Sequence, residues 1–472
     1  MTEEARYDLG MIGLGVMGRN LLLNMADHSF AVAGYDKDSS KVLNLQKEAE
    51  ARSIFAADSL KDLLGRLRLP RIVMLLVPAG SPVDDVIRDL EPLLSAGDLI
   101  IDGGNSYFRD TERRSADLKK KNLSFIGVGI SGGEHGARNG PSIMPGGPIG
   151  AYERVKPIFE AIAAKVGQSP CVTYLGPGSA GHYVKMVHNG IEYGVMQLIA
   201  ESFHLLKQSM GLSNDQLHSI YAQWNKTELD SYLVEITAAI FLQKDGRTGK
   251  YLVDVILDEA KQKGTGLWTS QEAMTLGVPL PTVDLAVMMR QLSDLKASRV
   301  SASQIRDNVN RTFQGDQEAF IEQVRNTLYV AMLITYSQGM SLLRVASDTY
   351  KYNLKLEDIA RIWQGGCIIR AALLEKIRNA YEARPDLQNL LLDPEFAGSI
   401  IDRQQHLRTV VQVAVELAIP IPGISVSLSY MDGFRSPWLP ANLIQAQRDY
   451  FGAHSYERVD AAGVFHTEWR EE

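Results

Sequence analysis

Short apolar runs, each about as long as a β-strand, recur through the first third of the chain. They occupy residues 9–13, 31–35, 71–77, 99–102 and 124–128. Segments with the spacing of amphipathic helices separate them, including residues 83–94 and 111–121. Apolar strands separated by helices predict a mostly parallel sheet with both faces covered. The pattern ends near residues 171–175.

The spacing of apolar residues becomes helical after residue 178 and stays so to about residue 417. Residues 184–210 and 319–344 contain no proline, so each predicts one long helix. From about residue 436, prolines and glycines break the chain into short pieces that are too small to bury a core. We expect this last segment to be a frayed tail or to dock on another surface.

A glycine-rich motif, Gly13-Leu-Gly-Val-Met-Gly18, follows the first apolar run and begins a helical segment. Its first two glycines permit a tight turn and close approach of the backbone to a pyrophosphate, and the helix N-terminus supplies N–H donors. We therefore predict an α/β Rossmann-like dinucleotide-binding domain over residues 1–177. A large all-α domain over residues 178–435 and a C-terminal tail over residues 436–472 follow it.

Asp36 ends the second apolar run, where an acidic group accepts hydrogen bonds from the adenosine ribose diol. A carboxylate at this place also repels a 2′-phosphate. Lys37 and Lys41 lie nearby and oppose that repulsion. The local sequence therefore favours NAD as cofactor and leaves NADP possible.

Composition excludes several classes of protein. The chain has 472 residues, with 45% hydrophobic and 22% charged, as in globular proteins with large cores. Its formal net charge is −7 without a block of like charge, so neither nucleic acid nor an anionic membrane is an expected partner. Cys171 and Cys367 suit a reducing compartment. With no signal-peptide pattern and no apolar run of roughly 20 residues, we expect a cytoplasmic protein.

Four chemically distinct side chains share one face of the first long helix. Lys185, His188, Asn189 and Glu192 have the spacing i, i+3, i+4 and i+7. An amine and a carboxylate on one face can form an acid/base pair, with the imidazole and the amide as orienting groups. The alternative is a solvated face with one charge pair. Gly190 inside this helix indicates close approach of another group to its backbone.

Two polar segments follow the fourth and fifth apolar runs. Asn105 lies in Asp-Gly-Gly-Asn-Ser, and Ser131 is followed by Gly132 and Gly133. Both segments are expected at the carboxyl edge of the sheet, where ligands bind in such folds. Ser131 and the two glycines could offer a hydroxyl and backbone N–H groups to a carboxylate. The alternative is a plain turn.

The chain resembles 6-phosphogluconate dehydrogenase (decarboxylating), a family of the β-hydroxyacid dehydrogenase superfamily, over its whole length. The motifs that carry the resemblance are Gly-Leu-Gly-Val-Met-Gly-Arg-Asn-Leu near the start, Ile-Ile-Asp-Gly-Gly-Asn-Ser at 100–106, the glycine-rich segment 129–147, Gly-His-Tyr-Val-Lys-Met-Val-His-Asn-Gly-Ile-Glu-Tyr at 181–193, residues 251–260 with Lys-Gly-Thr-Gly at 263–266, and Arg-Asp-Tyr-Phe-Gly-Ala-His at 448–454.

The resemblance implies an oxidative decarboxylation of 6-phosphogluconate to ribulose 5-phosphate with reduction of NAD or NADP. It implies that Lys185 is the general base and Glu192 the acid that protonates C1. The implied substrate-binding residues are Asn105, Ser131, Gly132, Gly133, His188, Asn189, Tyr193, Lys263, Arg290, Arg448 and His454. The implied cofactor-binding residues are Gly13, Leu14, Gly15, Val16, Met17, Gly18, Asp36, Lys37, Asp38, Val77, Pro78, Ala79 and Asn105.

The resemblance also implies a homodimer in which the tail of one subunit, carrying Arg448 and His454, completes the site of the other. No metal is expected, because the carbonyl formed by the oxidation is itself the electron sink for decarboxylation. Two alternatives stay open. One is a related β-hydroxyacid dehydrogenase that acts on an unphosphorylated sugar acid; the other is a nucleotide-sensing or scaffold protein without chemistry.

The chain departs from the family pattern around the expected cofactor site. Asp36-Lys-Asp38 stands where the family has Asn-Arg-Thr or Asn-Arg-Ser, and Pro78 stands where it has a lysine. Gly15 replaces a frequent alanine, and Leu267 replaces a lysine. The charge changes near the second and third runs weaken a 2′-phosphate site. NADP is the usual cofactor of the family, whereas Asp36 and Pro78 favour NAD here.

Overall fold

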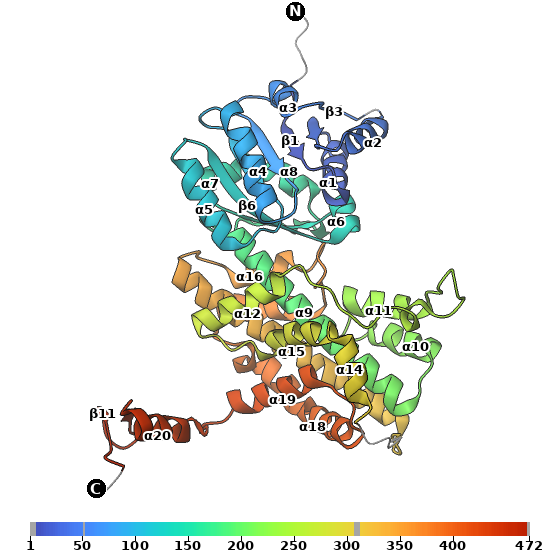
Figure 1. The fold of residues 1–472 in the computed structure, drawn as a ribbon, viewed down its shortest axis with the longest axis vertical. Helices are drawn as coiled ribbons and strands as arrows, with labels where there is room; N and C mark the ends of the chain where they lie inside the picture. The colour runs from blue at the N-terminus through green and yellow to red at the C-terminus, as the bar shows by residue number, and fades with distance from the viewer. Residues whose placement is uncertain (1–5, 51, 306–311, 470–472) are drawn as a thin grey trace, which may run out of the picture.

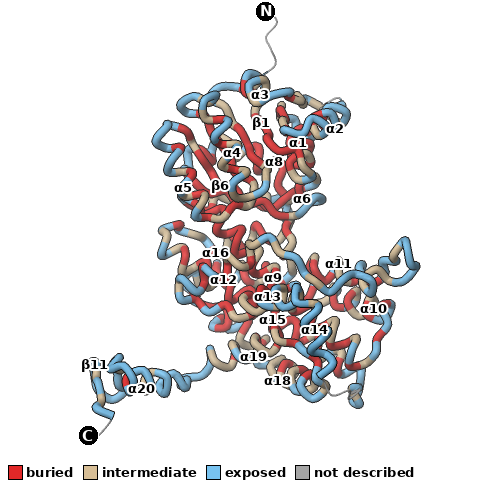
Figure 2. The backbone as a smooth tube through the Cα atoms, viewed as in Figure 1, coloured by how far each residue is buried: buried red, intermediate tan, exposed pale blue. Residues whose placement is uncertain are grey.

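The computed structural model describes residues 6–50, 52–305 and 312–469. Figure 1 shows an α/β unit, a larger helical unit and a small C-terminal piece that projects from the helical unit. Buried residues run through the middle of both large units, whereas the projecting piece is mostly exposed (Figure 2). The α/β unit followed by a large helical unit is the predicted fold class.

A seven-stranded sheet with the order β3-β2-β1-β4-β5-β6-β7 forms the centre of the α/β unit. Every neighbouring pair is parallel except β6 with β7. From β1 to β3 successive strands are added toward one edge of the sheet, and from β4 onward they are added toward the other edge. Ligands of doubly wound sheets bind at this switch point, between β1 and β4. The strands are β1 (Leu9–Ile12), β2 (Val32–Tyr35), β3 (Ile54–Ala56), β4 (Ile72–Leu75), β5 (Leu99–Asp102), β6 (Ser124–Ser131) and β7 (Ser142–Gly146).

The helices and short elements that complete this unit are α1 (Val16–Asp27), α2 (Ser39–Ala49), α3 (Leu60–Arg66), α4 (Ser81–Leu90), η1 (Glu91–Leu93), α5 (Phe108–Lys119), α6 (Gly133–Asn139), α7 (Ile149–Glu153), α8 (Lys156–Ile162), β8 (Lys165–Val166) and β9 (Ser169–Pro170). The five apolar runs correspond to β1, β2, β4, β5 and β6. The short edge strand β3 and the antiparallel β7 were not predicted.

The helical unit contains α9 (Ala180–Met210), α10 (Asn214–Trp224), α11 (Tyr232–Leu242), η2 (Leu252–Asp254), α12 (Thr265–Leu276), α13 (Pro281–Ser293), α14 (Lys296–Ser303), α15 (Gln317–Tyr350), α16 (Leu356–Ile362), α17 (Leu373–Ala383), η3 (Leu390–Leu392), α18 (Pro394–Glu416) and α19 (Pro422–Phe434). The two predicted long helices are α9 and α15, and both extend beyond their predicted limits. The Asp316 carboxylate caps the start of α15, and Gly211 ends α9 in the left-handed region at φ 65°.

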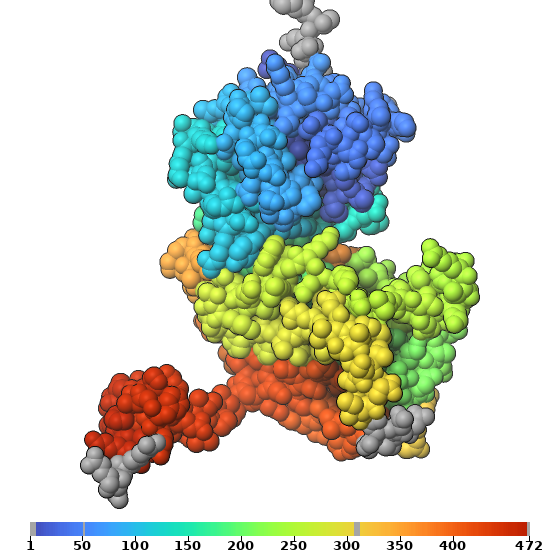
Figure 3. Space-filling view, viewed as in Figure 1, coloured from blue at the N-terminus to red at the C-terminus, as the bar shows by residue number. Residues whose placement is uncertain are grey.

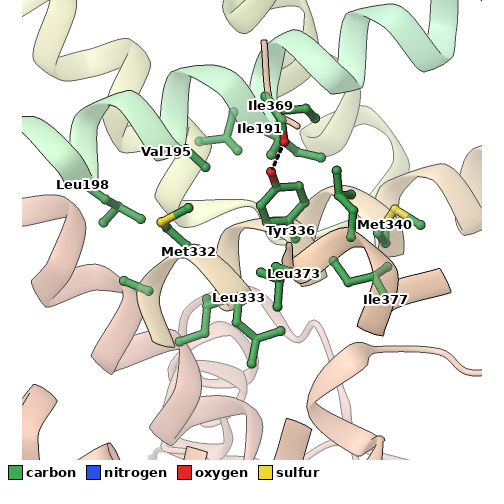
Figure 4. Close-up of a cluster of buried hydrophobic side chains, with 14 of the residues drawn as sticks. Ile191, Val195, Leu198, Met332, Leu333, Tyr336, Met340, Ile369, Leu373 and Ile377 are labelled. Carbon is green, nitrogen blue, oxygen red and sulfur yellow. Dashed lines mark hydrogen bonds between the residues drawn. The ribbon is translucent and has the colours of Figure 1, made fainter. Parts of the chain in front are cut away.

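The core of the helical unit lies between α9 and α15. Ile191 and Val195 of α9 pack against Tyr336 and its neighbours on α15 (Figure 4). The buried Tyr336 hydroxyl donates to the Ile369 carbonyl oxygen over 2.6 Å. This hydrogen bond satisfies a polar group in the core and fixes the chain after α16 against α15.

The N-terminal turns of α9 pack directly on β6 and β7 through glycines. A Cβ on Gly129 of β6 would collide with the Lys185 side chain, and a Cβ on Gly146 of β7 would collide with the backbone nitrogen of Gly181. A Cβ on Gly181 would in turn collide with the Met144 carbonyl oxygen. These three positions therefore allow backbone contact between the sheet and the helix that carries Lys185.

The C-terminal piece is a helix followed by a hairpin: α20 (Ala441–Gly452), β10 (Tyr456–Glu457) and β11 (Val464–Phe465). The strands β10 and β11 pair antiparallel. The expectation of a frayed tail is wrong for the described part, because a 12-residue helix forms between the proline and glycine positions. The boundaries 1–177, 178–435 and 436–472 remain a prediction.

Candidate active site

One large cleft, with a volume of about 1150 Å³, lies at the carboxyl ends of β1, β2, β4 and β5. The glycine-rich motif, the segment after β2, the segment after β4 and the Asn105 segment all line it. Residues from the helical unit close its other side: Asn189, Lys263, Thr265 and Trp268. The predicted cofactor-binding and substrate-binding segments therefore meet in a single space.

The glycine-rich motif has the geometry of a dinucleotide fingerprint. Gly13 has φ 97°, and a Cβ on Gly18 would collide with the Gly13 carbonyl oxygen. By contrast, a Cβ on Gly15 would meet no protein atom within 4 Å. No side chain caps the N-terminus of α1. The first-turn N–H groups and the open space at Gly15 fit the pyrophosphate of a dinucleotide.

Asp36 connects the end of β2 to the fingerprint. One carboxylate oxygen accepts from the Leu14 N–H over 2.8 Å, and the other accepts from the Asp38 N–H over 2.9 Å. The side chain is 8% exposed, and Lys41 Nζ lies 3.4 Å from it. The oxygen that binds Leu14 also accepts from Lys41, so the other oxygen is the one that keeps a lone pair for a further donor. The carboxylate is thus fixed at the cleft wall, and Lys41 is already its ion-pair partner.

Arg114 of α5 holds together the two loops that follow β4 and β5. Its guanidinium binds Asp84 with two hydrogen bonds of 2.8 and 3.0 Å and donates to the Gly80 carbonyl oxygen over 2.9 Å. It also donates to the Ser106 hydroxyl over 3.1 Å and to Asp102 over 3.3 Å. All five N–H groups of this buried arginine are therefore used.

The Asn105 side chain is bound to the end of β6. Its amide donates to the Ile130 carbonyl oxygen over 3.2 Å and accepts from the Ile130 N–H over 3.1 Å. The residue itself has φ 53°, in the left-handed region. These bonds place Asn105 between the cofactor segments and Ser131, which is the last residue of β6.

Lys185 lies at the centre of a buried polar cluster on α9. Its Nζ donates to the Asn189 side-chain oxygen over 2.6 Å and lies 3.2 Å from His188 Nδ1. On its other side, His188 Nε2 lies 3.2 Å from the Ser131 hydroxyl. The predicted shared face therefore exists, and it is a packed site rather than a solvated surface.

Burial sets the protonation of this cluster. It lowers the pKa of Lys185, and the nearby charge of Glu192 opposes the change. It raises the pKa of Glu192, against the effect of Lys185 and Arg290. Burial and Lys185 together hold the pKa of His188 well below its ordinary value. His188 is therefore neutral, and its 3.9 Å approach to Glu192 is not an ion pair.

The segment after β6 presents backbone to the site. Gly132 has φ 111° and Gly133 has φ 61°. A Cβ on Gly132 would collide with the Gly366 carbonyl oxygen, so the segment packs tightly on the chain after α16. A Cβ on Gly133 would meet nothing within 4 Å. Its backbone therefore stays open to a ligand.

Further along α9, Tyr193 and Arg290 form a second cluster. The Arg290 guanidinium lies 3.6 Å from the centre of the Tyr193 ring, and its charge acts on Glu192. Lys263 lines the cleft just before α12. Gly190, where the sequence indicated close approach of another group, faces Thr269 of α12, whose hydroxyl donates to the Met186 carbonyl oxygen. Tyr193 and Arg290 thus lie next to Glu192, at the far end of the face that carries Lys185.

Arg448 and His454 lie on the projecting C-terminal piece, away from the cleft of the same chain (Figure 3). Both side chains are exposed. Sequence reasoning also missed groups that shape the cleft: Thr265, Trp268, Arg114 and Asp84. Arg114 gave no signal, because a helical arginine normally points to solvent, and only the fold shows that its partners lie beneath it.

Among the residues that the structure describes, no group of His, Cys, Asp and Glu could hold a metal ion. Within the same residues, no helix is both long and apolar enough to span a bilayer. Cys171 and Cys367 are both buried and unpaired by a disulfide.

A dinucleotide fingerprint lines the cleft, and a buried helical lysine lies beside it, bound to Asn189 of the cleft wall. This combination is typical of a nicotinamide-dependent dehydrogenase of the β-hydroxyacid type. Residues 8–176 match the model of the NAD binding domain of 6-phosphogluconate dehydrogenase, and residues 181–469 match that of the C-terminal domain of 6-phosphogluconate dehydrogenase. The chain belongs to the 6-phosphogluconate dehydrogenase family.

Its relatives match it from end to end. The chain is 54% identical to a 6-phosphogluconate dehydrogenase, decarboxylating, of Synechococcus elongatus, covering 98% of this chain and 100% of that protein. It is 52% identical to the NADP(+)-dependent, decarboxylating enzyme of Bacillus subtilis, covering 98% of this chain and 99% of that protein. The solved structure of Plasmodium falciparum 6-phosphogluconate dehydrogenase is 45% identical, with a TM-score of 0.95, and the match covers 98% of this chain and 100% of that one. The resemblance first seen in the motifs is confirmed.

Proposed function

We propose that this chain oxidises and decarboxylates 6-phosphogluconate to ribulose 5-phosphate and carbon dioxide, with reduction of NAD or NADP. The observation that carries the proposal is the buried Lys185 with a lowered pKa, bound to Asn189 and His188 beside the dinucleotide cleft. The names of relatives that match over the whole chain support the same substrate and reaction.

The residues fit a stepwise reaction. A nicotinamide held in the cleft would supply the hydride acceptor for oxidation at C3 of the substrate. Neutral Lys185 takes the proton of the C3 hydroxyl and, once protonated, stabilises the negative charge that develops on that oxygen during decarboxylation. Glu192, whose pKa is raised by burial, can take up a proton and deliver it to C1. Asn105, Ser131 and the glycines after it hold the carboxylate end.

We propose that NAD is used at least as well as NADP. Asp36 is fixed at the cleft wall by two backbone N–H groups, so its charge cannot swing away from a 2′-phosphate. Lys41 is paired with Asp36, which leaves the exposed Lys37 to bind the phosphate. Asp85 and Asp89 of α4 line the same cleft and add negative charge to it.

We further propose a homodimer in which each tail completes the partner's cleft. Arg448 and His454 are held away from their own cleft on the projecting piece. Its helix exposes large apolar side chains, with Leu443 60%, Ile444 59% and Phe451 73% exposed. Apolar side chains gathered on one short helix mark a surface that another protein surface covers. The predicted cytoplasmic location rests on composition alone.

The runner-up is a dehydrogenase of an unphosphorylated sugar acid. Lys263 and Arg290 favour the phosphorylated substrate, because one carboxylate at the Ser131 end does not need two further cations. The test is an assay of the purified enzyme with 6-phosphogluconate or gluconate and either cofactor, in which reduced cofactor, carbon dioxide and ketopentose are all measured. We expect the three products in equal amounts from 6-phosphogluconate. Faster turnover of gluconate, or reduced cofactor without carbon dioxide, would contradict the proposal.

A further inference from the structure

The projecting C-terminal piece is held together by a buried carboxylate. Asp449 of α20 is 1% exposed. One of its oxygens accepts from the Ser455 N–H over 2.8 Å and lies 2.8 Å from His466 Nδ1. The other accepts from the Thr467 N–H over 3.0 Å and from the Trp469 indole N–H over 2.8 Å. The chain after α20 is thereby folded back onto the helix.

Gln445, one turn earlier on α20, connects Arg448 to the backbone that follows His454. Its side-chain oxygen accepts from Arg448 Nη1 over 3.1 Å, and its side-chain nitrogen donates to the Ser455 carbonyl oxygen over 2.6 Å. Because a guanidinium can only donate and a carbonyl can only accept, these two partners fix the orientation of the amide.

His454 is fixed by the same contacts, since it precedes Ser455. The N–H of Ser455 binds Asp449 and its carbonyl oxygen binds Gln445, so both sides of this residue are held by α20. The His454 ring lies against Gly452, where a Cβ would come within 2.8 Å of it, and 5.8 Å from the Phe451 ring centre. Ala453 and Ser455 have φ 49° and 57°, which reverses the chain at this point.

We propose that Gln445 is a positioning residue for the phosphate site: it couples Arg448 to the backbone next to His454, so that both side chains are presented to the partner's cleft in one fixed arrangement. The inference rests on the proposed function, which assigns Arg448 and His454 to the phosphate. Gln445 itself need not touch the substrate. It removes motion of an exposed arginine before binding, which lowers the entropy cost of holding a phosphate.

The test compares Gln445→Met with Gln447→Met in the full-length enzyme. Methionine keeps the length and the helix propensity of glutamine and removes both hydrogen bonds. Gln447 is an exposed glutamine of the same helix. For Gln445→Met we expect KM for 6-phosphogluconate to rise about tenfold, equivalent to about 1.4 kcal/mol. The inhibition constant of inorganic phosphate should rise in parallel. We expect kcat and KM for the cofactor to stay within about twofold of the wild-type values, and Gln447→Met to match the wild type.

Arg448→Ala distinguishes an error in the proposed phosphate site from an error in the proposed positioning role of Gln445. If Arg448→Ala leaves KM for 6-phosphogluconate unchanged, the phosphate site assigned to the tail is wrong. If Arg448→Ala raises KM and Gln445→Met does not, only the positioning role is refuted. A Gln445→Met enzyme that sediments as a monomer, or that loses kcat with an unchanged KM, would also overturn the inference, because its effect would then be structural.

Discussion

The chemistry of Lys185 follows from where the residue is placed. An exposed lysine is protonated at neutral pH and cannot act as a base. Lys185 is 5% exposed, and burial lowers its pKa. Its Nζ is bound to the neutral oxygen of Asn189, which orients the amine without adding a charge, and burial outweighs the opposing charge of Glu192. At the residue scale, burial of Lys185 and its hydrogen bond to a neutral amide allow this lysine to act as a base.

Lys185→Met should abolish hydride transfer and leave the fold intact, because methionine fills the same volume without a basic group. Loss of a general base costs on the order of 10²–10⁴ in rate. Reduced-cofactor formation in a single turnover measures the loss, and thermal unfolding with dinucleotide titration serves as the control. Wild-type turnover in a folded variant that still binds the cofactor would refute the assigned base.

Glu192→Gln should slow the steps after oxidation, because Glu192 is assigned the protonation of C1. It should also shift the pH profile of hydride transfer. The charge of Glu192 raises the pKa of Lys185, so its removal lowers that pKa. The limb along which the rate rises with pH then moves to lower pH. Stopped-flow absorbance and carbon dioxide release across pH test both parts. Wild-type rates for release and ketopentose formation would place the acid elsewhere.

Asp36→Asn combined with Pro78→Lys should shift cofactor preference toward NADP. The first change removes a negative charge from the cleft wall, and the second adds the cation that the family pattern has there. One such charge contact is worth about 1–3 kcal/mol, or about 5- to 150-fold in kcat/KM. The ratio of kcat/KM for the two cofactors is the measurement. A wild-type preference of tenfold for NADP, or no shift in the double variant, would contradict the proposed role of Asp36.

At the scale of single elements, α9 does more than carry the site. Glu201 lies two turns beyond Tyr193 on this helix and is 3% exposed. Its two carboxylate oxygens accept from the N–H groups of Gly423 and Ile424 over 2.8 Å each, in the first turn of α19. Burial raises its pKa to about 7, although these bonds and one from Gln197 oppose the change. The helix that leads to the tail therefore begins on a titratable group.

The stability of the enzyme should consequently fall as pH rises through Glu201's titration. The folded pKa, about 7, lies above the ordinary glutamate value of 4.5, so the folded state binds more protons between these values. The contribution lost by pH 8 is at most roughly 3 kcal/mol. In Glu201→Gln the fall in Tm from pH 5 to pH 8 should be smaller than in the wild type. Glu235→Gln, an exposed control, should match the wild type. Equal slopes in all three proteins would exclude Glu201.

The sequence predicts elements whose pattern is local. Buried strands such as β5, with the sequence Leu-Ile-Ile-Asp, can be recognised in the sequence as short apolar runs. The strand β3 has three half-buried residues, and β7 contains a proline and a glycine, so neither has a distinctive pattern. The helix α20 lies between proline and glycine positions that suggested breaks. Local pattern could not reveal these elements because packing against neighbours decides them.

The same limit applies to the site. The shared face of Lys185, His188 and Asn189 follows from helical spacing alone. The five-bond cluster around Arg114 could not be predicted, because its acceptors lie on three separate segments. The coupling of Arg448 to Ser455 through Gln445 depends on a reversal of the chain after α20. Gly452 predicts an end to the helix there but does not predict which residues the chain then contacts.

At the scale of the whole molecule, the projecting piece determines how many subunits are needed for one complete active site. Lys185 lies beside the cleft of its own chain, whereas α20, which carries Arg448, belongs to the piece that projects from the helical unit (Figure 3). If the tails are exchanged, one intact lysine and one intact tail on different subunits suffice for one site. Symmetry then gives two such sites per dimer.

Deletion from Pro440 onward should therefore abolish activity, and mixing that subunit with Lys185→Met should restore it. In a hybrid dimer, the deleted subunit supplies Lys185 and the other subunit supplies the tail, so one site of two is complete. Equal mixing should give about a quarter of the wild-type activity. Mass spectrometry of intact dimers verifies the hybrids, and each variant alone is the control. Inactive hybrids of confirmed composition would refute the exchange.

The glycine contacts between the sheet and α9 have a consequence for how the enzyme can move. Gly146 and Gly181 bring backbone against backbone, and Gly129 brings the backbone of β6 against the first carbons of the Lys185 side chain. A change in the angle between the units would have to separate atoms already at contact distance. The absence of a Cβ at these glycines thus sets how closely α9, which carries Lys185, approaches the sheet. Even a methyl group at Gly146 or Gly181 would push α9, and Lys185 with it, away from the sheet without touching the lysine itself.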